Sequence, residues 1–178
     1  ISFVGFWGHS QGGWIAPLAG SRWAHTAFVI TSAGPAVPPS REAEWDVVRR
    51  LRAAGLSNDI EEKAREIIQL WHRGVRSGDW SAFDHALSGA KAESWFETAD
   101  FSVFLDRPGE AFVRSYRAIM DYDPIPALTS LSVPMLAILT PDDESIDAVE
   151  TASILRELRH NGYPIELKLY PGYDHSMR

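Results

Sequence analysis

Apolar and polar positions divide the chain into short apolar runs separated by longer amphipathic segments. The apolar runs cover residues 1–7, 24–31, 133–139 and 163–170. Runs of this length, rich in Val, Ile, Leu and Phe, predict strands of a parallel sheet. Segments 11–22 and 147–160 follow such runs and have helical character, so the order strand, helix, strand predicts βαβ units and an α/β fold.

The pattern changes in the middle of the chain, which is charged and rich in Trp and where apolar residues recur with the period of a helix. The helices expected there cover residues 40–55, 57–78, 80–87 and 110–120. Such a stretch is too long to be a loop within a compact domain. We therefore expect an α/β core made of residues 1–37 and 128–178, with an inserted helical domain at residues 38–127.

The first apolar run leads into Gly8-His9-Ser10-Gln11-Gly12-Gly13, which fits the nucleophile elbow pattern Gly-x-Ser-x-Gly. A sharp turn between strand and helix would place Ser10 at its apex as a nucleophile. Gly8 and Gly12 are expected to be required there, because a Cβ would clash where strand and helix cross. The backbone N–H of Gln11, at the positive end of the helix, would stabilise an oxyanion.

A base and an acid follow later strands of the expected sheet. Asp142 and Asp143 come after the third strand and His175 after the fourth. The carboxyl ends of parallel strands meet at one edge, so these groups are expected to lie near Ser10. His175 would take the proton of Ser10, and an aspartate would orient its ring. Spacing alone leaves Asp142 and Asp143 both open as that acid.

Together these stretches resemble the α/β-hydrolase superfamily, and most closely its bacterial carboxylesterases and acyl hydrolases with a helical cap. The residues that carry the resemblance are 8–18, 133–143 and 170–175. It implies a carboxylic-ester hydrolase (EC 3.1.1.-) that works through an acyl-serine intermediate and needs no cofactor. The family usually has Gly-x-x-Asp after the third strand, and counting from Thr140, which replaces that Gly, favours Asp143 over Asp142. A peptidase or amidase of the same fold is the alternative.

The resemblance also implies several strands before the elbow, one of whose loops supplies the second oxyanion N–H. We therefore expect a truncated α/β-hydrolase core, missing the N-terminal strands, with feeble or no turnover. The first strand would then have an unpaired apolar edge. The alternative that is not an enzyme is a catalytically weak fragment that forms homo-oligomers through this edge.

Charge and composition narrow the choice of partners. The net charge is 17 − 24 = −7, which argues against nucleic acid or a membrane surface and leaves a small-molecule ester as the expected partner. Cysteine is absent, and no pair of histidines has zinc-helix spacing, so no metal is expected. His9 is expected to pack near the elbow. The remaining histidines expected on the surface or in the cap are His25, His72, His85 and His160.

Overall fold

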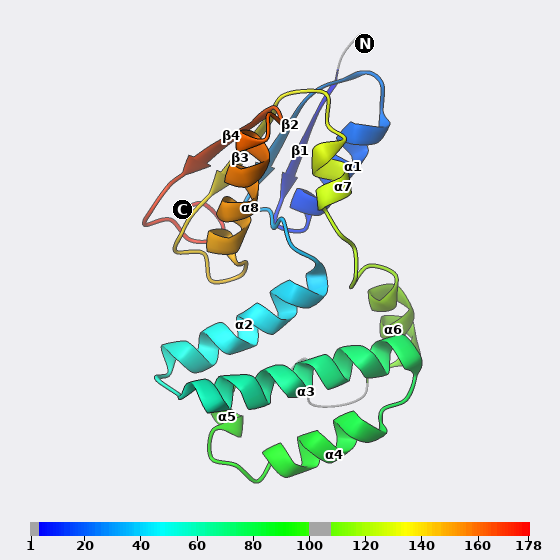
Figure 1. Cartoon of the computed structure of the whole chain (residues 1–178), viewed down its shortest axis with the longest axis vertical. Coiled ribbons are helices and arrows are strands. Elements are labelled where there is room, and N and C mark those ends of the chain that lie inside the picture. The colour runs from blue at the N-terminus through cyan, green and yellow to red at the C-terminus, as the bar shows by residue number, and fades with distance from the viewer. Residues whose placement is uncertain (1–3, 100–107) are drawn as a thin grey trace. The chain divides into compact units, whose positions relative to one another are not determined.

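The computed structural model of the chain describes residues 4–99 and 108–178. Two compact units are present, and Figure 1 shows the elements of each. Residues 1–38 and 123–178 form one, which we call the sheet unit, and residues 39–122 form the other, the helical unit. The sequence placed residue 38 and residues 123–127 in the helical insertion, whereas they belong to the sheet unit.

Four parallel strands in the order β1-β2-β3-β4 form the sheet. Their bounds are β1 Val4–His9, β2 Thr26–Ser32, β3 Met135–Leu139 and β4 Ile165–Leu169. The α/β class and the parallel sheet are thus confirmed, while the expected first three residues of the first strand lie outside the described part. The shared direction of the strands brings the segments after β1, β3 and β4 to the same edge of the sheet.

One face of the sheet is covered by three helices, α1 Gly12–Arg22, α7 Ile125–Thr129 and α8 Ala148–His160. Val29, Ala137 and Leu139 point into this core and are fully buried. On the opposite face the side chains of Trp7 and Phe28 are 68% and 45% exposed. The sheet unit therefore rests on a single core beneath one face, built from strand residues that alternate in direction.

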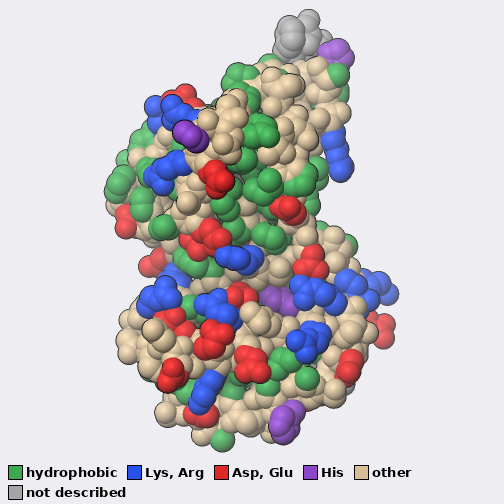
Figure 2. Space-filling model, in the orientation of Figure 1, with side chains coloured by type: hydrophobic (Ala, Val, Ile, Leu, Met, Phe, Trp, Pro, Cys, Tyr) green, Lys and Arg blue, Asp and Glu red, His purple; other side chains and the backbone are tan. Residues whose placement is uncertain are grey.

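The helical unit is built from amphipathic helices around a core of aromatic and aliphatic side chains. Its helices are α2 Pro39–Ala53, α3 Asn58–Ser77, α4 Ser81–Ala90, α5 Phe96–Ala99 and α6 Glu110–Arg117. Trp71 and Phe83 are its largest fully buried side chains. Figure 2 shows basic and acidic side chains interspersed on the visible surface of these helices. The short helices α5 and α7 were not predicted, because four or five residues are too few to show a helical period.

Candidate active site

Ser10 lies in the turn between β1 and α1, and its backbone is held in an unusual conformation. Its φ is +55°, in the left-handed region that side chains other than glycine rarely adopt. The Ser10 N–H donates to the carbonyl of Ser32 at 3.0 Å, and its own carbonyl accepts from the N–H of Gly13 at 2.7 Å. The end of β2 and the start of α1 therefore hold the strained turn in place.

The glycines around this turn differ in whether a Cβ would fit at their positions. A Cβ on Gly8 would lie 2.1 Å from the carbonyl oxygen of Gly12, so the expectation for Gly8 is confirmed. The expectation for Gly12 is wrong, because a Cβ there would meet no atom within 4 Å. The tight crossing lies one residue later, where a Cβ on Gly13 would lie 2.3 Å from the Cα of Gly34.

His175 lies between the other two side chains expected at the site. Its Nε2 is 3.0 Å from Oγ of Ser10, and its Nδ1 is 2.9 and 3.0 Å from the two carboxylate oxygens of Asp143. In the tautomer with the proton on Nδ1, the ring donates to Asp143 and presents the Nε2 lone pair to the serine hydroxyl. The loops after β1, β3 and β4 thus bring hydroxyl, carboxylate and imidazole into one hydrogen-bonded chain.

The carboxylate of Asp143 is held from several sides. Its side chain is fully buried, whereas that of His175 is 23% exposed. Oδ1 of Asp143 also accepts the backbone N–H groups of Ser145 and Ile146 at 2.8 and 3.1 Å. These donors compensate for the loss of water around the buried carboxylate and fix its direction toward the imidazole.

The second carboxylate that the spacing left open has another contact. Oδ2 of Asp142 accepts the backbone N–H of Gly172 at 2.6 Å. Asp142 therefore bonds the backbone of the loop that carries His175, whereas Asp143 bonds the imidazole itself. The two neighbouring carboxylates have separate places at the site.

Gln11 and His9 flank Ser10 on either side. Gln11 is the N-cap residue of α1, so its backbone N–H lies at the positive end of an 11-residue helix, directly after the serine. The ring of His9 lies 5.1 Å from the ring of His175, measured between centroids. This fits the packing role expected for His9 and shows that its packing partner is the imidazole of the site.

His72, expected on the surface or in the cap, is a buried residue of the helical unit. Its side chain is 3% exposed, and its Nε2 lies 3.2 Å from the hydroxyl of Tyr116. Burial, helped by the nearby charge of Arg76, lowers the pKa of His72 to about 4. Burial likewise raises the pKa of Tyr116 to about 12. Both side chains are therefore neutral at pH 7, and together they form part of the core.

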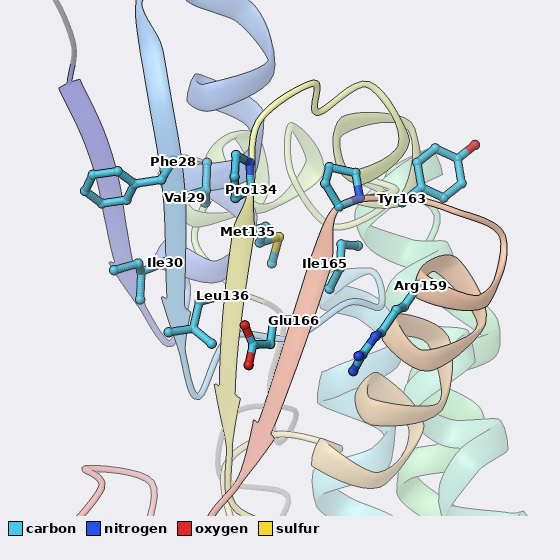
Figure 3. Close-up of a pocket in the computed structure, with 11 residues that line it drawn as sticks. Phe28, Val29, Ile30, Pro134, Met135, Leu136, Arg159, Tyr163, Ile165 and Glu166 are labelled. Atoms are coloured by element: carbon cyan, nitrogen blue, oxygen red, sulfur yellow. The ribbon is translucent and has the colours of Figure 1, made fainter.

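Two surface depressions lie at opposite ends of the strands. One, of about 410 Å³, is lined by His175 and by neighbouring residues of two loops, among them Asp142, Glu144 and Tyr173. The other, of about 520 Å³, is lined by residues near the amino ends of β3 and β4, among them Pro134 and Ile165, with Arg159 and Tyr163 beside them (Figure 3). The first adjoins the hydrogen-bonded chain at His175, whereas the second lies at the other end of the strands.

No cluster of three or more potential metal-binding side chains occurs within residues 4–99 and 108–178. Over the same residues, no helix combines the length and the apolar character that crossing a bilayer requires.

No protein-family profile matches the sequence, and no match to a curated protein was found. Among solved structures, the proline iminopeptidase of Mycobacterium smegmatis aligns with 98% of this chain at 17% identity and a TM-score of 0.50. An α/β-hydrolase enzyme from a Medee basin deep-sea metagenome library aligns with 99% at 16% identity and a TM-score of 0.50.

The aligned region covers 59% of the length of each of these two proteins. The chain thus has the fold of α/β-hydrolases over a little more than half of the length of such enzymes. At these identities the likeness establishes the fold alone.

Proposed function

We propose that this chain, which has an α/β-hydrolase fold, acts as a serine hydrolase that cleaves carboxylic esters. The observation that carries the proposal is the position of His175, whose two ring nitrogens lie within 3.0 Å of Ser10 Oγ and of the Asp143 carboxylate. A serine, an imidazole and a buried carboxylate in this order are the parts that nucleophilic acyl transfer requires.

In the first half of the reaction, Nε2 of His175 takes the hydroxyl proton while Oγ of Ser10 attacks the ester carbonyl carbon. The oxyanion that forms lies next to the backbone N–H of Gln11 and the positive end of α1. His175 then returns the proton to the leaving alcohol as the carbon–oxygen bond breaks, which leaves an acyl-serine. Water, deprotonated by the same nitrogen, attacks the acyl carbon. The bond from that carbon to Oγ of Ser10 then breaks, His175 returns the proton to Oγ, and the carboxylic acid is released.

Asp143 would stabilise the imidazolium that forms during each proton transfer and hold the ring in the productive tautomer. Burial of its carboxylate strengthens this effect, because the charge interacts with the imidazolium in a medium of low dielectric constant.

We further propose that the helical unit is the cap of this hydrolase. Its support is its place in the chain, between β2 and β3, which pair in the sheet. Cleavage of the helical unit by limited proteolysis should change the relative rates with short-chain and long-chain esters. Labelling of Ser10 by a small fluorophosphonate should persist. Unchanged relative rates after complete cleavage would contradict a cap role.

Covalent labelling with a fluorophosphonate is the direct test of the nucleophile, since it requires only the first half-reaction. The wild-type chain should gain one phosphonyl group on Ser10, read by mass spectrometry of the tryptic peptide that ends at Arg22. Ser10→Ala should abolish labelling, and the exposed Ser81→Ala should leave it unchanged. If Ser10 stays unmodified while the chain is folded, the proposal is wrong.

Short-chain nitrophenyl esters and aminoacyl nitroanilides then distinguish an esterase from a peptidase or amidase. We expect hydrolysis of the esters, and loss of about 10⁶-fold in kcat on removal of the nucleophile where turnover is measurable. Faster cleavage of the anilides would assign the chain to the amide-cleaving alternative.

A further inference from the structure

The loop that carries His175 has little apolar packing to hold it. Residues 170–174 between β4 and the histidine are all exposed, and Gly172 has a φ of +81°. A loop without buried side chains gains little from packing, so its position depends on hydrogen bonds to a more rigid element. The rigid element beside it is the turn that follows β3.

Thr140, at the end of β3, bonds this loop directly. Its side chain is fully buried, and its Oγ1 donates to the carbonyl of Tyr173 at 2.8 Å. The same oxygen lies 3.3 Å from the N–H of Asp142, from which it accepts. One buried hydroxyl thus connects its own turn to a residue two positions before His175.

Asp142 provides the second connection, through the 2.6 Å bond between its carboxylate and the N–H of Gly172. The bonds to Tyr173 and Gly172 hold two consecutive residues of the loop, and the bond that the imidazole donates to Asp143 holds the ring of His175. Three side chains of the turn after β3 therefore hold three residues of the 170–175 loop. These residues are Gly172, Tyr173 and His175.

We propose that Thr140 and Asp142 are positioning residues that hold the 170–175 loop so that Nε2 of His175 stays within reach of Ser10. The proposal rests on the hydrolase function proposed above. Thr140 stands where the resembling family usually has glycine, which has no hydroxyl to donate. With a glycine at position 140, the loop would lose the bond at Tyr173 and keep the bond of Gly172 to Asp142.

A displacement of the imidazole by about 1 Å is enough to lower the rate of such a reaction about 10²-fold. Thr140→Val keeps the shape of the side chain and removes the donor, whereas Thr140→Ser keeps the donor. We expect Thr140→Val to lower the rate of fluorophosphonate labelling by up to this factor, and Thr140→Ser to restore it. Asp142→Ala should act in the same direction and Asp142→Asn, which retains an acceptor oxygen, should act less.

A spectroscopic readout separates positioning from mere stability. The Nδ1 proton of His175, hydrogen-bonded to Asp143, should give a downfield proton resonance in the wild type. We expect Thr140→Val and Asp142→Ala to broaden or lose this resonance through faster exchange with water, and Thr140→Ser to keep it. Circular dichroism records whether each variant is folded. Because Asp142 is exposed, its two variants are expected to fold even if a variant of the buried Thr140 does not.

The outcomes distinguish this proposal from the proposed function. If Thr140→Val and Asp142→Ala keep both the resonance and the wild-type labelling rate, the positioning role is refuted. If the wild type shows the resonance, the variants lose it, and Ser10 is never labelled, the positioning role stands and the hydrolase function is wrong. A folded Asp142→Ala variant with an unchanged resonance overturns the role of Asp142 even if Thr140→Val does not fold.

Discussion

In each unit one histidine lies near a carboxylate, and burial of the two groups is opposite in the two units. In the sheet unit, the side chain of Asp143 is fully buried and faces the partly exposed His175. In the helical unit, the arrangement is reversed, with His72 buried and the carboxylate of Asp121 54% exposed in a pair with Arg76. A buried carboxylate is costly unless something holds it, and here backbone N–H groups and an imidazole do so.

The difference separates side chains that are arranged for chemistry from side chains that stabilise a fold. The reactive edge of the sheet unit depends on hydrogen bonds between turns, since its loop is exposed. The helical unit depends on burial of aromatic side chains, while its pair between Arg76 and Asp121 is about half exposed. Substitutions in the two units should therefore change different properties, and the following predictions test this from the largest effect to the smallest.

Asp143→Asn should have the largest effect and should act on reactivity alone. The amide retains an oxygen for the N–H groups of Ser145 and Ile146 but favours the wrong tautomer of His175, which costs about 10⁴-fold in rate in serine hydrolases. The labelling rate of Ser10 measures the loss, and the thermal unfolding midpoint should change little. A variant that labels as fast as the wild type would show that Asp143 has no part in the chemistry.

Trp71→Ala should have the largest effect on stability in the helical unit. The ring is 1% exposed and contacts Trp80, Phe112 and Tyr116, so its loss should cost about 3–5 kcal/mol. Protection of the α3 amides in hydrogen exchange measures this cost. Trp7→Ala, at a site 68% exposed, is the matched control in the sheet unit. Equal losses of stability in both variants would contradict the contrast between the units.

Acid should weaken the helical unit through His72. Because burial lowers its folded pKa to about 4 from about 6.5 in the unfolded chain, the unfolded state takes up the proton first. The stabilisation is complete above pH 6.5 and is lost as the pH falls toward 4, by about 3 kcal/mol in all. Glu44 and Asp121 oppose the shift, and Arg76 adds to it.

The measurement is the free energy of unfolding between pH 7 and 4, followed at the α3 amides. His72→Gln should remove this part of the pH dependence, and His85→Gln, at an exposed position of α4, should leave it intact. If His72→Gln and the wild type lose stability in parallel, His72 is not the group responsible.

The pair between Arg76 and Asp121 should have the smallest effect. Its bonds of 2.8 and 2.5 Å join side chains that are about half exposed. The hydrogen bond from Arg76 holds the pKa of Asp121 below its usual value, but exposed pairs contribute only about 0.2–1 kcal/mol. A double-mutant cycle with alanine at both positions measures the coupling, which should fall further in high salt. A coupling of several kcal/mol would contradict the contrast between this exposed pair and the pair of the buried Asp143 with His175.

Much of the candidate site could be predicted from the sequence because each of its parts has a local signal. The elbow pattern identified Ser10, and the order of acid and base after later strands identified Asp143 and His175 as candidates. Local spacing could not choose between Asp142 and Asp143, which are neighbours on one turn. The tertiary contact decided between them, since it depends on where a loop about 30 residues further along the chain lies.

Some features of the fold could likewise be predicted from the local sequence, and others could not. The apolar runs identified the strands, and their alternation with helical segments predicted the parallel sheet. The runs did not show that Trp7 and Phe28, on one face of the sheet, are exposed. Short helices such as α5, the burial of His72 and the crossing of Gly13 over Gly34 could not be predicted. Each depends on which segments meet in space, and residues distant in the sequence leave no pattern in their own neighbourhood to show it. Sequence alone thus determined the elements and the chemical groups, and the tertiary structure decided which groups touch.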